Sequence, residues 1–493
     1  MVHAPAADHL TRHREPLTGQ LCLLSDHDAW DPTMLLAEHL TAQLPKLLAS
    51  NAPGHRPAER QVEAPEPEPV TAYMRGRWPR LVLVDGGWQI DDHVLHGTAV
   101  AVLRRGGDLE VLGRVQSLSD AEGRSLCATP STVTLGSRVV MPWARVETPP
   151  ADVAPEDLWQ QVTARAAAPP GSLDDDRVQL VVAVVREEVR YREFGDSLVL
   201  LVRGRADRRR RWQYGVVLTE RAGREDLAVR SPETAPLATR RVLVCGLGAL
   251  GGPAALDLAR AGVGHLDLLD GDIVTAGTVP RQLAGLEEVD LPKVVTTALR
   301  VLRHAPFCEV RAHHQRLGSL VTRGPDVLDL LDEADLVLDC TASPLVTRFL
   351  AAHASASGTP LLVATATGGA WGGTVTRLPA SGGGCWRCLE LHRADGTVVW
   401  PRERPNDSVR PLGCSEPTFT GTAVHLAPVW QLATAMAVDA LSGLGGAYDD
   451  VAVLHQRTAD GRPVPPMWSG EPLVPHAGCP DHDAAVQLPL FST

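Results

Sequence analysis

The second half of the chain alternates short apolar runs with glycine-rich and helical segments, which is typical of parallel α/β proteins. The clearest case is residues 241–272, where an apolar run, a glycine turn, a helical segment and a second apolar run follow one another. This order predicts a strand, a turn, a helix and a second strand. We expect a further buried strand within residues 335–341 and a helical stretch that begins at Pro292.

The first half has a different pattern, with short β-like runs separated by turns. These runs lie at residues 81–84, 98–103, 109–115, 178–185, 198–202 and 215–218. One helical segment, residues 155–167, lies among them. We therefore expect a β-rich middle region, residues 71–235, in which the sequence shows no recognisable chemistry. The preceding residues 51–70 are rich in proline and glutamate, so we interpret them as a linker.

Composition favours a multidomain protein, because 493 residues at 44% hydrophobic content exceed what one core normally holds. The net charge of −12 argues against broad nucleic-acid binding. No apolar run approaches a membrane span and no leader opens the chain, so we expect no membrane association and a cytoplasmic location. Nine cysteines, several of them spaced like ligands or nucleophiles, suit a reducing compartment.

The glycine turn predicts a nucleotide site. Gly246, Gly248 and Gly251 supply a tight turn, a close backbone approach to phosphate and close helix packing, while the amides at the helix start face the anion. Asp270 ends the second predicted strand, where a carboxylate can accept hydrogen bonds from ribose hydroxyls. These features alone fit both a dehydrogenase and an adenylating enzyme.

Cations after the second strand favour a triphosphate as the ligand. Arg281 and Gln282 follow Asp272, and Lys293 opens the next helical stretch. A guanidinium and an ammonium can neutralise phosphate oxygens and stabilise pyrophosphate as it leaves. A dinucleotide-dependent redox enzyme has no need of these two cations.

The pairs Cys385-x-x-Cys388 and Cys479-x-x-His482 have the spacing of a tetrahedral zinc site with two ligands from each segment. Four protein ligands leave no position for a catalytic water, so we interpret the site as structural. His476 is a competing fourth ligand. The alternative is a set of unpaired thiols beside a surface histidine.

Together these motifs resemble the ThiF/MoeB and ubiquitin-activating superfamily over roughly residues 236–485, and we take residues 236–493 as a Rossmann-like adenylation domain with a zinc knuckle. The resemblance implies that the glycine loop and Asp270 hold ATP, and that Arg281 and Lys293 contact its phosphates. Asp272, Gln282 and Asp339 complete the expected nucleotide site. The implied substrate is the C-terminal carboxylate of a ubiquitin-like or other carrier protein, which attacks the α-phosphate to give an acyl-adenylate.

Two positions depart from the family pattern. The family usually has asparagine at the position of Thr278 and aspartate at the position of Ala342. That aspartate normally helps to hold Mg²⁺, so the expected magnesium site depends on Asp339 or Asp272 instead. The loss of a metal ligand can remove several kcal/mol of transition-state stabilisation.

Two cysteines are candidate nucleophiles. Cys414 is at the position where many members of the superfamily carry the cysteine that forms a thioester with the activated protein. It follows a polar stretch from His392 to Gly413 that we expect to be mobile. A structural cysteine beside a helix start is the alternative interpretation.

Residues 1–50 resemble part of a ubiquitin-conjugating enzyme, with Gly-Gln-Leu-Cys22-Leu, then Trp30-Asp-Pro32, then an amphipathic leucine-rich run. No His-Pro-Asn precedes Cys22, and the chain begins about twenty residues before it. An ordinary buried cysteine in a short strand is the alternative.

The resemblances together imply a fusion of activating and conjugating modules, as in bacterial anti-phage operons of the CBASS type. There the fused enzyme joins the C terminus of a cGAS-like nucleotidyltransferase to a target. The expected path is adenylation, a thioester on Cys414, transfer to Cys22, and amide formation on a protein lysine or small amine. The family also makes a homodimer an expectation.

Three alternatives stay open. A sulfur-carrier-activating adenylyltransferase would use the same ATP site without Cys22. A nicotinamide-dependent oxidoreductase would use only the glycine loop. A pseudoenzyme scaffold would bind zinc and ATP without exchanging pyrophosphate.

Overall fold

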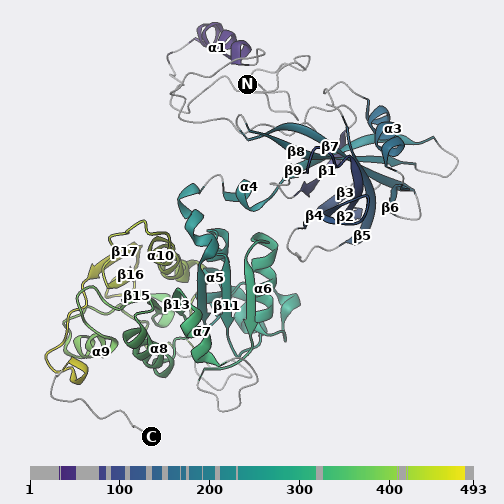
Figure 1. The fold of residues 1–493 in the computed structure, drawn as a ribbon. Coiled ribbons are helices and arrows are strands. Elements are labelled where there is room, and N and C mark those ends of the chain that lie inside the picture. The colour runs from purple at the N-terminus through teal and green to yellow at the C-terminus, as the bar shows by residue number, and fades with distance from the viewer. Residues whose placement is uncertain are drawn as a thin grey trace. The chain divides into compact units, whose positions relative to one another are not determined.

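The computed structural model describes residues 33, 35–50, 77–84, 90–105, 111–128, 136–146, 154–166, 168–173, 177–190, 193–205, 211–228, 231–317, 326–407, 409, 418 and 420–482. The chain divides into two compact units, residues 1–227 and 228–493, and each is described by itself (Figure 1). The expected linker, Cys22 and Cys414 lie outside the described residues.

The first unit consists mainly of strands. They are β1 (Arg77–Val84), β2 (His96–Arg105), β3 (Val111–Asp120), β4 (Ser125–Ala128), β5 (Ser137–Arg145), β6 (Gly171–Leu173), β7 (Val178–Arg190), β8 (Glu193–Gly204) and β9 (Gln213–Arg221). Helices α1 (Leu36–Ser50) and α3 (Pro155–Arg165) belong to it, and α4 (Arg224–Ala228) lies at its end. The β-rich character predicted from the apolar runs is confirmed.

These strands close into a barrel. The order is β1-β9-β8-β7-β5-β2-β3-β4, and β1 also pairs with β3 in parallel through Val82 and Gly113. Strand β6 adds to β7 outside this path. Closure removes the free edges that an open sheet would expose for pairing.

Residues 180–185 of strand β7 form an unbroken apolar run. Leu180, Val182 and Val184 belong to the core inside the barrel, which also contains the fully buried Trp143. The alternate residues Val181, Ala183 and Val185 pack instead beneath α3. Because successive side chains of a strand point to opposite faces, burial of both faces requires apolar residues at every position.

The second unit alternates strands and helices. Its strands are β10 (Arg241–Cys245), β11 (His265–Leu269), β12 (Glu309–His313), β13 (Leu336–Asp339), β14 (Leu361–Ala366), β15 (Gly372–Leu378), β16 (Val451–Arg457) and β17 (Pro463–Glu471). Its α-helices are α5 (Gly251–Arg260), α6 (Lys293–His304), α7 (Val327–Glu333), α8 (Pro344–Ser357), α9 (Trp386–Asp395) and α10 (Ala423–Ser442). Short 3₁₀ segments are η2 (Pro232–Thr239), η3 (Ala276–Arg281), η4 (Leu286–Glu288), η5 (Gly368–Ala370) and η6 (Pro480–His482).

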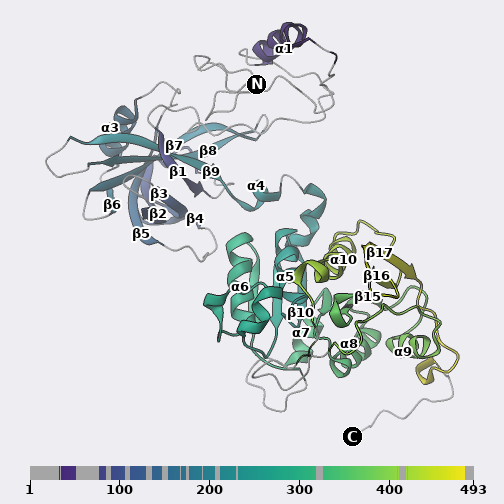
Figure 2. The same ribbon diagram turned by 180° about the vertical axis from the view of Figure 1, so that it is seen from behind.

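One eight-stranded sheet forms the centre of this unit, in the order β12-β11-β10-β13-β14-β15-β16-β17. The strands β12 to β14 in this order are parallel, and β15, β16 and β17 are antiparallel. Helices α5, α6 and α10 share one core layer with the sheet, and α7, α8 and α9 share the other (Figure 2). The predicted Rossmann-like α/β fold is confirmed.

This topology fixes where a ligand can bind. The chain runs from β10 to β11 and β12 on one side of β10 and then crosses over from β12 to β13 on the other side, so the sheet reverses its strand order between β10 and β13. Ligands of open α/β sheets bind outside the carboxyl ends of the strands at such a switch point. The loop after β10 is the predicted glycine loop.

Within the described ranges, no helix combines the length and the apolarity that a membrane crossing requires.

Candidate functional site

The three glycines of the loop after β10 lie in different structural surroundings. Gly246 has a φ of +82°, and a Cβ there would lie 2.8 Å from the backbone of Thr341, in the loop after β13. A Cβ on Gly251 would lie 1.9 Å from the carbonyl oxygen of Gly246. Beside Gly248 there is open space. The loop therefore combines a turn that only glycine tolerates with one position that another molecule can approach closely.

Helix α5 starts three residues after this open position. Leu250 occupies the N-cap and offers no side-chain acceptor to the amide of Gly251, whereas the Gly252 amide donates to the Gly248 carbonyl at 3.3 Å and Pro253 has no N–H. Unpaired amides at a helix start, together with the helix dipole, make a site for an anion. The loop can thus hold a phosphate group through its backbone.

Asp270 follows β11 and stabilises the glycine loop through hydrogen bonds. Its Oδ2 accepts a hydrogen bond from the Leu247 amide at 2.6 Å, and its Oδ1 accepts one from the Asp272 amide at 2.7 Å. Each carboxylate oxygen has a second lone pair, so these bonds leave acceptor capacity for a ribose hydroxyl. Ribose binding by Asp270 stays a prediction.

Lys293 and Asp272 form an ion pair at the same edge of the sheet. The Nζ atom of Lys293 lies 2.9 Å from Oδ2 of Asp272, and a terminal nitrogen of Arg316 lies 2.8 Å from Oδ1. Burial alone would raise the pKa of Asp272, but the charge and hydrogen bond of Lys293, with those of Arg316, lower it. The ion pair thereby holds Lys293 at the start of α6.

Arg281 ends η3 and points toward a different segment. It donates a hydrogen bond at 2.9 Å to Oγ1 of Thr418, and burial lowers the pKa of its guanidinium. Thr418 pairs with Val409 through two backbone hydrogen bonds of 2.7 Å. Gln282 donates to Oγ1 of Thr278 at 2.6 Å. Arg281 therefore links the predicted phosphate site to residues that flank Cys414 in the sequence.

Asp339 is 1% exposed at the end of β13. Its Oδ1 accepts hydrogen bonds from the amide and hydroxyl of Thr341, and its Oδ2 accepts one from the hydroxyl of Thr347 at 2.6 Å. Burial raises its pKa despite these bonds. Ala342 has a φ of +55° and presents a methyl group at the position where the sequence resemblance predicts a carboxylate.

The four predicted zinc ligands lie together. The ligand atoms of Cys385, Cys388, Cys479 and His482 are all within 4.8 Å of one another. The Sγ atom of Cys385 is 3.7 Å from that of Cys388 and 3.6 Å from that of Cys479. Sulfurs bound tetrahedrally at about 2.3 Å from zinc are roughly 3.8 Å apart, whereas a disulfide is about 2.05 Å long. The donor set therefore fits zinc.

His476 is not part of this cluster. Its ring accepts a hydrogen bond from the Gly478 amide at Nδ1 and contacts Asp395 at 2.9 Å through Nε2. Its backbone amide donates to Sγ of Cys388 at 3.3 Å. His476 therefore hydrogen-bonds the sulfur of Cys388 without belonging to the ligand set. His482 is the histidine whose ring lies with the three cysteine sulfurs.

Asp450 joins the two ligand-bearing segments. This fully buried residue, just before β16, accepts hydrogen bonds from Ser381 and Gly382 on one segment and from the Leu473 amide on the other. Arg377 also pairs with it at 2.8 Å. Burial by itself would raise the pKa of Asp450, but these donors lower it well below its ordinary value.

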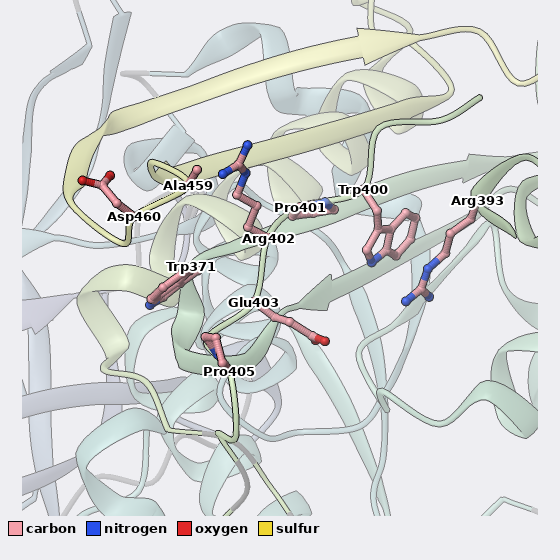
Figure 3. Close-up of a pocket in the computed structure, with 9 residues that line it drawn as sticks. All are labelled: Trp371, Arg393, Trp400, Pro401, Arg402, Glu403, Pro405, Ala459 and Asp460. Carbon is pink, nitrogen blue, oxygen red and sulfur yellow. The ribbon is translucent and has the colours of Figure 1, made fainter. Parts of the chain in front are cut away.

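Sequence reasoning missed a groove of about 480 Å³ in this unit. Trp371, Arg393, Trp400, Pro401, Arg402, Glu403, Pro405, Ala459 and Asp460 line it (Figure 3). Part of the stretch that the sequence suggested to be mobile forms its wall, and Pro401 within it is buried. Two tryptophans beside glycine and proline, in a chain with 4% aromatic residues, were the available signal.

The predicted residues thus fall into three groups. Gly246, Gly248, Gly251, Asp270, Asp272, Lys293 and Asp339 lie at one edge of the sheet, around the ends of β10, β11 and β13. Arg281 and Gln282 follow on η3, and the four cysteine and histidine ligands form a separate cluster. The two candidate nucleophiles lie outside the described residues.

The chain is similar to several known proteins. The ThiF family model matches residues 225–452. The uncharacterized protein y4oA of Sinorhizobium fredii is 30% identical over 514 residues, covering 95% of this chain and 85% of y4oA. The sulfur carrier protein ThiS adenylyltransferase of Escherichia coli is 34% identical over 243 residues, covering 49% of this chain and 84% of that protein.

Among solved structures, E. coli MccB with ATP is 14% identical, with a TM-score of 0.37, and covers 50% of this chain and 68% of MccB. The match to y4oA extends through the barrel unit as well as the sheet unit, whereas the match to the ThiS adenylyltransferase covers about half of the chain. The chain belongs to the ThiF family.

Proposed function

We propose that this protein uses ATP to adenylate the C-terminal carboxylate of a ubiquitin-like or other partner protein. The proposal rests mainly on one observation. An open glycine loop and Lys293 lie at the same edge of a ThiF-family sheet, at its switch point. The family includes named adenylyltransferases, among them the E. coli relative that acts on ThiS. This membership favours ATP over a nicotinamide dinucleotide.

The chemistry divides among the residues of the sheet edge. The amides at the start of α5 bind phosphate oxygens, and Asp270 accepts hydrogen bonds from the ribose. The carboxylate attacks the α-phosphorus, the bond from that phosphorus to the bridging oxygen breaks, and pyrophosphate leaves. Lys293 and Arg281 stabilise the negative charge that develops on the leaving group. Lys293 has three N–H donors, so it can retain Asp272 while it contacts a phosphate.

Magnesium fits the described residues poorly. Asp339 is buried with both oxygens bonded to threonines, Asp272 is paired with Lys293 and Arg316, and position 342 is alanine. Within the described ranges, these are the carboxylates expected to hold the ion, and both already have partners. We therefore assign the stabilisation of the developing negative charge to Lys293 and Arg281, and no step of the proposed reaction depends on Mg²⁺.

Transfer of the activated carboxyl is the second part of the proposal. A cysteine thiolate attacks the acyl-adenylate carbonyl, a thioester forms and AMP leaves. Cys414 lies between Val409 and Thr418 in the sequence, and Arg281 binds Thr418. Cys22 then accepts the acyl group in a second thioester exchange and passes it to an amine.

Zinc has a structural role in this proposal. Cys385, Cys388, Cys479 and His482 supply a closed set of four ligands, which leaves no position for substrate. Bound zinc would join η6 and the C-terminal segment to α9. Removal of zinc by a chelator is expected to lower the melting temperature of the protein, and zinc re-addition should restore it. An unchanged melting temperature would contradict a structural metal.

Activation of a sulfur carrier is the second candidate, because the ThiS adenylyltransferase is similar over 84% of its length. Both candidates share the adenylation step, and they differ in the fate of the activated carboxyl. The variant Cys22→Ala separates the two candidates: a sulfur-carrier-activating enzyme keeps its full activity, whereas the conjugating path stops at the Cys414 thioester.

The proposed adenylation is tested by ATP–pyrophosphate exchange. Purified full-length protein is incubated with ATP, Mg²⁺, labelled pyrophosphate and candidate partner proteins, including small proteins encoded beside its gene. Label is expected to enter ATP when a partner with a free C-terminal carboxylate is present, and a partner with an amidated C terminus is the matched control. Equal exchange with both partners, or none with any, contradicts the proposal.

A further inference from the structure

We propose that His392, Asp395 and His476 form a second metal site, separate from the zinc cluster, which binds one divalent transition-metal ion. We call these three residues the histidine–aspartate triad. Their ligand atoms, one from each residue, all lie within 4.8 Å of one another. Two imidazoles and one carboxylate suit a divalent first-row transition metal, and three protein ligands leave coordination positions for water. The site goes beyond the proposed adenylation, because no step of that reaction uses it.

One face of α9 carries ligands for both sites. Cys388, His392 and Asp395 are spaced four and three residues apart on this helix, so they follow one another along the same face. The C-terminal segment lies against that face. The His392 ring bonds the Val474 carbonyl at 3.0 Å, and the His476 amide bonds Sγ of Cys388 at 3.3 Å. The zinc cluster thus lies toward the start of α9, and the triad lies toward its end.

The ring of His392 is prepared to bind a cation. A carbonyl oxygen only accepts hydrogen bonds, so the contact with Val474 places the ring proton on Nε2 and leaves a lone pair on Nδ1. His392 is 8% exposed, and no described residue donates a hydrogen bond to Nδ1. A buried acceptor without a donor costs about 1–3 kcal/mol, and an ion bound at Nδ1 removes that cost. The Val474 carbonyl also fixes the orientation of the ring, as the outer partners of metal-bound histidines do.

Asp395 and His476 supply the other two ligands. Oδ2 of Asp395 lies 2.9 Å from Nε2 of His476, and Oδ1 of Asp395 accepts a hydrogen bond from the Thr397 amide at 2.9 Å. Two ligands that are about 2.1 Å from one ion, at right angles to each other, are about 3.0 Å apart, so this pair needs little movement. The Asp395 side chain is 45% exposed, which gives an ion and its water ligands access from solvent.

Binding of the ion exchanges one hydrogen bond. Nδ1 of His476 accepts a hydrogen bond from the Gly478 amide at 2.9 Å, so the neutral ring carries its proton on Nε2. An ion at Nε2 moves that proton to Nδ1, and the amide must then turn away. Gly478 is exposed and has no side chain, so its backbone can rotate at low cost. Ion binding is therefore linked to the conformation of the turn before Cys479.

The triad lies near the edge of the sheet opposite the glycine loop. The Leu473 amide, in the C-terminal ligand segment, bonds Asp450, which pairs with Arg377 near the end of β15. Strand β15 ends beside the start of β14, because Leu378 pairs with Leu361. The glycine loop instead follows the carboxyl end of β10, which is parallel to β13 and β14. We therefore expect the second ion to leave pyrophosphate exchange unchanged.

Metal counting tests the proposal without requiring catalysis. Purified full-length protein is dialysed against a metal buffer that fixes the free Zn²⁺ concentration, and bound zinc is measured by mass spectrometry. We expect two zinc ions per chain in the parent protein, and one in His392→Gln and in Asp395→Asn. The dissociation constant of the second ion should rise about 100-fold or more in both variants, because loss of an outer partner alone typically costs 10–100-fold.

Three features keep the result interpretable. Glutamine at position 392 retains a donor for the Val474 carbonyl, and asparagine at position 395 retains an acceptor for the Thr397 amide, so both variants should fold. Asp332→Asn is the matched control, because it removes a carboxylate 3.6 Å from His353, outside both clusters, and should leave two ions bound. Equal thermal unfolding of the metal-free variants and the metal-free parent protein excludes misfolding as the cause.

Each outcome decides the proposal. One ion per chain in the parent protein overturns it, and so does a second ion that either triad variant retains. Loss of both ions from Asp395→Asn, or a loss that Asp332→Asn shares, also overturns it, since the triad would then not be a separate site. A second ion that both triad variants lose, with Asp332→Asn unaffected, supports the site. Failure of pyrophosphate exchange with two ions bound overturns the proposed function alone.

Discussion

Two buried aspartates of the same sheet, on either side of β10, have opposite electrostatic environments. Asp267 in β11 is fully buried and Asp339 at the end of β13 is 1% exposed. Burial alone would raise both pKa values. Hydrogen bonds from His313, Arg311 and Arg241 lower the pKa of Asp267 well below its ordinary value, whereas the pKa of Asp339 remains raised.

The difference comes from the partners. Arg311 binds Asp267 through two nitrogens, at 2.6 and 2.7 Å, Arg241 binds it at 3.0 Å and His313 at 2.8 Å. Asp339 has only hydroxyl and amide donors from Thr341 and Thr347. The negative charge of Asp267, within the sheet, is thus neutralised by basic side chains. Asp339, beside the glycine loop, has neutral hydrogen-bond donors instead, and these fix the local backbone geometry.

The largest effect is expected when the charge of Asp267 is removed. Asp267→Asn removes the buried anion that Arg241 and Arg311 share and leaves them only the half-exposed Glu333 among the described acidic residues paired with them, which should destabilise the sheet unit by about 3–5 kcal/mol. Chemical denaturation of the purified protein measures this loss. Asp257→Asn is the matched control, because its partner Arg260 is largely exposed, and it should cost less than about 1 kcal/mol. Equal losses in both variants would break the comparison.

The dependence of stability on pH should have opposite signs at the two aspartates. The pKa of Asp267 is lowered in the fold, so its contribution is present above the unfolded value of about 3.9 and is lost as the pH falls below that value. The pKa of Asp339 is raised, so its charged form opposes folding, and its contribution declines as the pH rises above about 3.9.

Denaturation at several pH values, for the parent protein and for each asparagine variant, tests these signs. The stability difference between parent and Asp267→Asn should shrink as the pH falls from 6 to 3. The stability of Asp339→Asn relative to the parent should rise as the pH rises above 4. The same sign for both variants would contradict the assignment.

The smallest effect is expected for Asp339→Asn at fixed pH. The amide oxygen can accept the bonds from Thr341, and the amide nitrogen can donate to Thr347, so the change in stability should stay within about 1 kcal/mol. Pyrophosphate exchange should fall less than tenfold. A loss above a hundredfold, with stability unchanged, would instead show that Asp339 holds a metal ion during catalysis.

Local signals explain what could be predicted from the sequence. The strands, glycine turn and helix of residues 241–272 are contiguous, so their apolar periods and glycine spacing predict β10, α5 and β11. The two ligand pairs each have a recognisable internal spacing, although 90 residues separate Cys388 from Cys479. The sequence alone therefore indicated both the loop and the cluster.

Features that depend on distant pairing could not be predicted. Closure of the barrel requires β1 to pair with both β9 and β3, which no local pattern encodes. Strand β5 contains Pro142, a residue that argues against a strand, and the apolar pattern did not predict it. The groove is assembled from the turn after β14, residues 400–405 and the hairpin after β16, so its residues gain a common role only in the fold.

The central claim is that the edge of the sheet at Gly248 and Lys293 activates a carboxylate with ATP. The most direct measurement is the pyrophosphate exchange rate of Lys293→Ala, compared with the parent and with Arg316→Ala, the other cation that pairs with Asp272. We expect exchange to fall about 10²–10³-fold in Lys293→Ala, with the melting temperature unchanged, and to change little in Arg316→Ala. Exchange that persists at the parental rate in Lys293→Ala would contradict the account.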